Sequence, residues 1–105
     1  MPQFDVYRNT NAATRVRYPL LLDVQSDLLS ELATRAIVPL CSAASMKGKL
    51  LGRLTPVVQI EGKPYVMVTA QLAGVDARQL GAKVAELASQ RQIVMAALDF
   101  LITGV

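Results

Sequence analysis

The chain has 105 residues, of which 52% are hydrophobic and 18% are charged; this balance excludes a disordered chain and predicts one domain over residues 1–105. A mean hydropathy of +0.35 is high for this length. Such a chain buries only roughly two thirds of its unfolded surface alone, so the apolar excess predicts an oligomer. The net charge of +3 comes from basic residues spread along the chain, which argues against direct binding of nucleic acid.

The longest apolar run has about ten residues and contains Asp99, well short of the ~20 that span a bilayer. We therefore expect no contact with the membrane. The first residues are neither basic nor apolar, so no secretory signal is expected. The single cysteine, Cys41, follows an apolar run and cannot form an internal disulfide. A buried thiol in a cytoplasmic protein is the simplest interpretation.

Three strands are predicted in the first half of the chain. Alternating apolar and polar residues predict a strand over residues 4–7, which an exposed, arginine-rich loop follows over residues 8–17. Residues 18–25 are predicted to form a strand, because their apolar centre is too short for a stable helix. Residues 26–34 are predicted as a loop or single helical turn, in which two adjacent leucines favour contact with a partner. Residues 36–40 form the third predicted strand.

Within this third strand, Pro39 favours an edge position or a bulge, because proline donates no ladder hydrogen bond. Residues 42–53 are predicted as a loop with minor structure. Two β-rich runs at residues 56–60 and 65–69 then predict a hairpin, with Gly62 in a positive-φ conformation. Asp76 is predicted to cap a short helical stretch over residues 77–87.

The predicted order is five strands and then a helix, with no βαβ alternation and no repeat. This order indicates an α+β, mainly β fold, in which the C-terminal helix closes or covers an antiparallel five-stranded sheet.

The C-terminal helix is predicted over residues 89–105, because Ser89 and Gln92 have the spacing of a capping box. Asp99 is the only ionisable residue between positions 93 and 102, so the helix is apolar nearly all round. We expect a second copy of the protein to cover its remaining face. An ordinary core helix with no functional end is the alternative. Gly104 suits the left-handed residue that ends a helix.

Sequence signatures of enzymes are mostly absent. The chain has no histidine and one cysteine, so we expect no zinc site, other metal or cofactor. Asp23 and Asp27 are close in sequence, but turn and surface roles are far commoner than a catalytic pair. Arg8, Arg15 and Arg17 could contact phosphates, although a solvated loop is the commoner role.

Several segments together resemble the CcdB toxins of bacterial toxin–antitoxin modules. They are Phe4-x-Val6-Tyr7, Leu22-Asp23-Val24-Gln25-Ser26-Asp27, Val38-Pro39-Leu40, Pro56-Val57-Val58-x-Ile60 and the ending Gly104-Val105. The segment of residues 23–27 is the most specific. The resemblance covers essentially the whole chain, and residues 20–105 align without a gap with plasmid-encoded members. The loop of residues 9–15 is longer here.

The resemblance implies an SH3-like barrel of the CcdB/MazF type that forms a homodimer and has no enzymatic activity or cofactor. Such toxins bind the A subunit of DNA gyrase, trap its complex with cleaved DNA as topoisomerase poisons, and serve in plasmid maintenance. A CcdA-like antitoxin, partly disordered until it binds, neutralises them.

By resemblance, gyrase would be contacted mainly by the end of the helix, with support from the loop after the second strand. The residues are Ser26, Leu28, Leu29, Asp99, Ile102, Thr103, Gly104 and Val105. The dimer interface is expected at Leu98, Leu101, Ile102 and Val105. Thr103 replaces a tryptophan of the plasmid-type toxin, so a contact worth roughly 1–2 kcal/mol is missing. The ending instead resembles the chromosomal branch, and we expect weaker or differently anchored binding.

Two alternatives stay open. One is a MazF-like ribonuclease, which would draw on Arg8, Arg15, Arg17, Arg35 and Thr69 around the scissile phosphate. The other is a degenerate toxin that only binds antitoxin.

Overall fold

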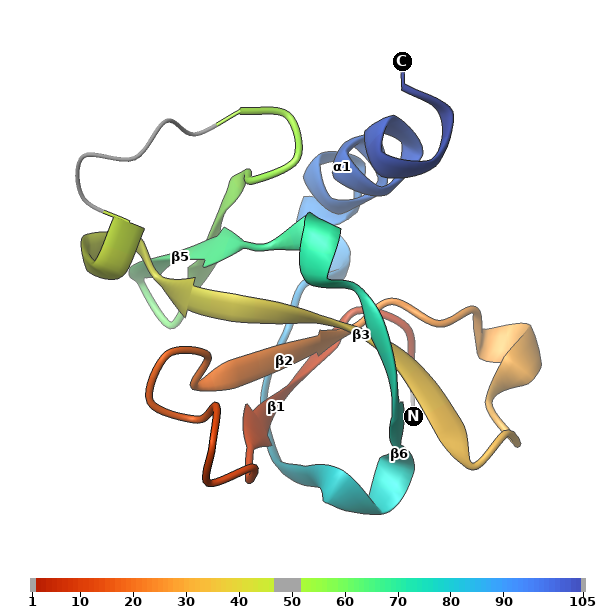
Figure 1. The fold of residues 1–105 in the computed structure, drawn as a ribbon. Coiled ribbons are helices and arrows are strands. Elements are labelled where there is room, and N and C mark those ends of the chain that lie inside the picture. The colour runs from red at the N-terminus through yellow and green to blue at the C-terminus, as the bar shows by residue number, and fades with distance from the viewer. Residues whose placement is uncertain (1, 47–51, 105) are drawn as a thin grey trace.

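The computed structural model describes residues 2–46 and 52–104, and in this part of the chain seven strands form one antiparallel sheet. The strands are β1 (Asp5–Asn9), β2 (Leu20–Asp23), β3 (Thr34–Ser42), β4 (Val57–Ile60), β5 (Lys63–Met67), β6 (Ala73–Asp76) and β7 (Leu80–Glu86). Their order is β4-β5-β3-β2-β1-β7, and β6 also pairs with β3. Figure 1 shows the sheet curling into a half-barrel, with the helix α1 (Arg91–Thr103) at the end of the chain. The α+β, mainly β fold class is confirmed.

The strands alternate between two buried faces. Leu20 and Leu22 of β2 point into the main core, where they join Val94 and Ala97 of α1. Leu21 and Asp23 point to the opposite face and are also buried. Burial on both faces explains why β2 reads as a nearly continuous apolar run rather than as an alternating one.

Pro39 lies in the central strand β3, so the expected edge position is wrong. Its carbonyl accepts a hydrogen bond from the Val68 N–H, at the point where β5 ends and β6 has not yet begun. The N–H and C=O of one strand residue point the same way. The donor that proline lacks would therefore face this break between two partner strands, and the sheet loses no ladder hydrogen bond.

The helical stretch predicted over residues 77–87 is wrong beyond its first turn. The Asp76 side chain does cap a 3-10 turn, Ala77–Gln79, but Leu80–Glu86 then forms β7 on the edge of β1. Long-range pairing with β1 outweighs local helix propensity here. Gly81 was the available signal in the sequence against a helix here. In the structure, a Cβ at this position would lie 2.9 Å from the Arg8 carbonyl oxygen, so the close approach of β1 requires glycine. With β6, this makes seven strands instead of five.

The start of α1 also differs from expectation. Ser89 lies in a 3-10 turn, Ala88–Gln90, and the helix begins at Arg91 with no side-chain cap, so the Ser89–Gln92 capping box is wrong. Gln90 instead pairs with the backbone of Gln59, accepting from its N–H at 2.9 Å and donating to its carbonyl at 2.8 Å. This pairing fixes the helix start against β4.

Three local predictions are confirmed. Glu61 and Gly62 both have positive φ, at 52° and 78°, in the two-residue turn of the β4–β5 hairpin. Gly104 ends α1 in the left-handed conformation. The Cys41 thiol is buried. In the predicted loop of residues 42–53, Ala43–Met46 forms a 3-10 turn, and residues 47–51 lie outside the described chain. None of the helices described is long and apolar enough to cross a membrane.

Candidate functional site

The end of α1 is an exposed surface with a fixed backbone. Gly104 has φ 76° and donates its N–H to the Phe100 carbonyl at 3.0 Å, so the last turn is closed. The Thr103 hydroxyl donates to the Asp99 carbonyl at 2.7 Å and is thereby held against the helix. Ile102 remains 75% exposed. We call Asp99, Ile102, Thr103 and Gly104 the helix tip; Val105, also expected at the site, lies outside the described residues.

The body of α1 packs one of its sides against the core. Val94 and Ala97 are fully buried, and Leu98 packs against the core from a half-buried position. The Arg53 guanidinium lies 4.4 Å from the centre of the Phe100 ring, which fastens the segment before β4 to the last turns of the helix. Of the residues expected at a dimer interface, Leu98 and Leu101 are half-buried in one chain and Ile102 is exposed.

A second exposed apolar surface is the 3-10 turn Asp27–Leu29, which follows β2. Ser26 begins the turn by accepting the Leu28 N–H at 3.2 Å, and Asp27 accepts the Gln3 N–H at 2.6 Å. These two bonds hold the leucine side chains outward. Leu28 is 94% exposed and Leu29 is 50% exposed. We call residues 26–29 the leucine turn.

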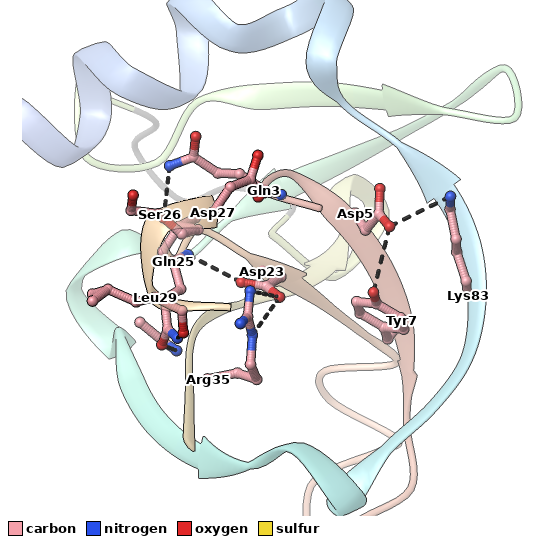
Figure 2. A network of polar contacts seen from close by, with 12 residues as sticks. Gln3, Asp5, Tyr7, Asp23, Gln25, Ser26, Asp27, Leu29, Arg35 and Lys83 are labelled. Atoms are coloured by element: carbon pink, nitrogen blue, oxygen red, sulfur yellow. Dashed lines mark hydrogen bonds and ion pairs between the residues drawn. The ribbon is translucent and has the colours of Figure 1, made fainter. Parts of the chain in front are cut away.

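A buried polar network supports the leucine turn from below, as Figure 2 shows. Arg35 of β3 forms an ion pair with Asp23 of β2, with Nη2 2.7 Å from Oδ2, and neither side chain has exposed area. The other oxygen of Asp23 accepts the Gln25 N–H at 3.0 Å. The Gln25 side chain donates to the Leu29 carbonyl at 2.8 Å and accepts the Ala36 N–H at 2.9 Å. The turn is therefore tied directly to two strands.

Asp23 and Asp27 bond to different groups, Asp23 to the Arg35 guanidinium and Asp27 to the Gln3 N–H. Burial raises the pKa of the Asp23 carboxyl, and this shift is opposed by the Gln25 N–H and the Arg35 guanidinium. The Asp27 carboxylate accepts a hydrogen bond from the Gln3 N–H at the surface. Both carboxylates thus have structural roles.

Beside this pair, Asp5 and Tyr7 of β1 meet Lys83 of β7. The Tyr7 hydroxyl donates to Asp5 Oδ2 at 3.4 Å, and Lys83 Nζ lies 3.4 Å from the same oxygen. Burial raises the pKa of Tyr7, and the negative charges of Asp5 and Asp23 add to the shift. The contact between Asp5 and Lys83 joins β7 to the sheet through side chains as well as backbone.

The structure does not bring the helix tip and the leucine turn into one cluster. Figure 1 shows the C-terminal end of α1 at the top and the orange turn of residues 27–29 to the right of β3. A single chain therefore presents two separate exposed apolar surfaces, each joined to the fold by hydrogen bonds.

A comparison with protein families matches residues 3–104 to the model described as CcdB protein. The chain belongs to the CcdB family. It is therefore a toxin of the toxin–antitoxin type, as the resemblance predicted. The match covers both the leucine turn and the helix tip of this CcdB-family toxin.

The residues that support the leucine turn are the ones that sequence reasoning missed. Arg35 was considered only as a possible phosphate ligand, and Gln25 was not singled out for any role. Arg35 offered a signal, because it directly precedes the apolar run of residues 36–41, where an ionisable side chain needs a partner. Gln25 lies in a largely polar stretch and offered none.

Proposed function

We propose that this toxin inhibits DNA gyrase by binding the A subunit with the helix tips of a homodimer. The observation that carries the proposal is the tip itself, where Ile102 is 75% exposed on a turn closed by Gly104 in the left-handed conformation. An exposed apolar side chain on a closed helix turn gains from burial against a partner, which suits it as an anchor.

A second copy is the best cover for the half-buried side of α1. Leu98 and Leu101 are partly exposed in one chain, and Ile102 continues their apolar surface to the tip. A two-fold interface along these residues would bring two tips together. The A subunit of gyrase is itself a dimer, so paired tips would offer it two equivalent contacts.

The tip chemistry predicts an aliphatic contact with gyrase. Thr103 occupies the place of an aromatic residue, and its hydroxyl is already bonded to the Asp99 carbonyl. Ile102 is then the largest exposed apolar side chain of the tip. The leucine turn adds Leu28 and Leu29 as a second contact, and a CcdA-like antitoxin would neutralise the toxin by covering these surfaces.

The ribonuclease alternative is weakened by two of its five candidate residues. Arg35 is fully buried in the ion pair with Asp23, and Thr69 is fully buried as well. Neither side chain is available to a scissile phosphate at the surface. The remaining candidates, Arg8, Arg15 and Arg17, are all exposed and belong to one segment.

The direct test is a supercoiling assay with purified gyrase, scored for lost supercoiling and for trapped cleaved DNA. We expect the toxin to inhibit supercoiling and to leave cleaved DNA bound to gyrase, and a CcdA-like antitoxin to reverse both effects. RNA cleavage by the purified toxin, with gyrase unaffected, would contradict the proposal. Antitoxin binding without an effect on gyrase would identify a degenerate toxin.

A further inference from the structure

A cleft of about 240 Å³ lies between the β4–β5 turn and the strands β1, β2 and β7. Its floor is apolar and consists of Leu20 of β2, Ile60 of β4 and Val84 of β7. Leu20 and Ile60 are buried members of the main core, and Val84 packs against that core from a half-buried position. The cleft therefore opens directly onto the main core.

Three charged side chains complete the lining of this cleft, together with the half-buried ring of Tyr65. They are Arg8, Glu61 and Lys63, and all three residues are exposed. Among the described residues, none of the ion pairs involves any of these three. Their charges are therefore available to a ligand in the cleft.

Strand pairing places the two cations on the core side of the sheet. Arg8 faces Leu20 across β1 and β2, and Lys63 faces Ile60 across β4 and β5. Residues that face each other in an antiparallel pair project their side chains from the same face of the sheet. Arg8 and Lys63 therefore project from the face that carries the buried leucine and isoleucine, so positive charge borders the apolar floor from two sides.

The chemistry of the lining matches an α-amino acid with an aliphatic side chain. Arginine and lysine donate strong charge-assisted hydrogen bonds to a carboxylate, and a glutamate accepts them from an ammonium group. The apolar floor would cover an aliphatic side chain. A simple anion would be repelled by the Glu61 carboxylate, and a purely apolar ligand would leave all three charges unused.

The size of the cleft also suits a free amino acid. Its volume of about 240 Å³ equals that of roughly eight waters in the liquid. Pockets for drug-sized ligands usually have about 300–1,000 Å³. A nucleotide or a larger cofactor would therefore exceed the cleft, whereas a molecule of the size of leucine fits.

We propose that this cleft binds a free α-amino acid with an aliphatic side chain. Arg8 and Lys63 hold the carboxylate of the ligand, Glu61 holds its ammonium group, and the aliphatic side chain lies on the apolar floor. The site is distinct from the helix tip and from the leucine turn, and it does not depend on gyrase binding.

The test is an NMR titration of the full-length protein with free L-leucine, followed through the methyl groups of Leu20, Ile60 and Val84. We expect saturable binding with a Kd of about 1 mM or lower, and shifts centred on these methyl groups. Isocaproate lacks the ammonium group of leucine, and isoamylamine lacks its carboxylate. Each analogue should bind at least about tenfold more weakly than leucine. Absence of saturable binding, shifts centred outside the cleft, or equal binding by either analogue would overturn the proposal.

Two variants assign the charged groups of the ligand. Lys63→Gln and Glu61→Gln should each weaken leucine binding by at least about fivefold, because each removes one charge that faces the ligand. The matched controls are Arg15→Gln and Glu31→Gln, at exposed positions outside the lining of the cleft, and both should bind leucine normally. Thermal unfolding of all four variants controls for folding. Normal leucine binding by folded Lys63→Gln or Glu61→Gln would contradict the proposal.

Discussion

Asp23 and Arg35 form a fully buried ion pair, with 2.7 Å between Oδ2 and Nη2 and no exposed side-chain area on either residue. The pair lies on the face of the sheet opposite to the core of α1 and directly beneath the leucine turn. A buried pair is weak evidence of stability gained, but breaking it leaves an uncompensated charge in the interior. Its two residues are therefore sensitive positions for the proposed binding surface.

Asp23→Asn should lower the free energy of unfolding by about 3–5 kcal/mol, because the Arg35 guanidinium would lose its carboxylate while staying buried. Denaturant unfolding measures this change. Asp76→Asn is the matched control, since Asp76 forms an ion pair with Arg78 whose side chain is 90% exposed. Its effect should be much smaller and should vanish at high salt. Equal losses in the two variants would show that Asp23 is not buried.

Gln25→Leu should loosen the leucine turn while the rest of the fold persists. The change removes the bonds to the Leu29 carbonyl and the Ala36 N–H, at a cost of about 1–3 kcal/mol for the groups left unpaired. Hydrogen exchange at the Leu29 and Ser30 amides should become faster, and gyrase inhibition should weaken. Gln92→Leu, at an exposed position on α1, controls for the loss of an amide. Unchanged exchange at the turn would refute this role for Gln25.

Tyr7 should make the stability of the protein fall at high pH. Its folded-state pKa is raised above the ordinary value of about 10, so above that pH the folded state binds more protons than the unfolded state. The contribution of Tyr7 to stability is therefore fully present below about pH 10, and it is lost as the pH rises through the folded-state pKa of Tyr7. Phenolate absorbance of the folded protein should contain a late step that Tyr7→Phe removes. If the late step persists in Tyr7→Phe, the step belongs to another tyrosine.

Leu101→Ala should weaken the proposed dimer more than the fold of one chain, since Leu101 is only half-buried in the monomer. Sedimentation at several concentrations should show dissociation at a higher concentration than for the unaltered protein. Val94→Ala, a fully buried position, should instead cost roughly 2–3 kcal/mol of stability at every concentration. If the unaltered protein is a monomer at every concentration, Leu101 lies in no dimer interface.

Local chemistry made the hairpin and the helix end predictable. Gly62 and Gly104 each occupy a position that needs positive φ, and such glycines can be read from one stretch of sequence. The exposed leucines were also visible, because two apolar residues in a short connection have no core face to occupy. The helix tip could thus be located from the sequence, although the residues that support the leucine turn could not.

Long-range pairing was not predictable. The strand β7 carries helix-forming residues and becomes a strand because the edge of β1 is available 70 or more residues earlier in the chain, where Asp5 faces Glu86 and Tyr7 faces Lys83. The partnership of Asp23 with Arg35 likewise depends on the register between β2 and β3. Both follow from tertiary contacts that override local propensity.

The proposed binding of gyrase to the end of α1 can be tested with a matched pair of glycines. Gly104 and Gly62 have φ of 76° and 78°, and a Cβ at either would meet nothing within 4 Å. Arginine therefore introduces similar backbone strain and the same charge at the helix tip and at the β4–β5 turn. In the supercoiling assay with purified gyrase, we expect Gly104→Arg to abolish inhibition and Gly62→Arg to retain it, with both variants folded. Full inhibition by folded Gly104→Arg would show that gyrase does not bind the end of α1.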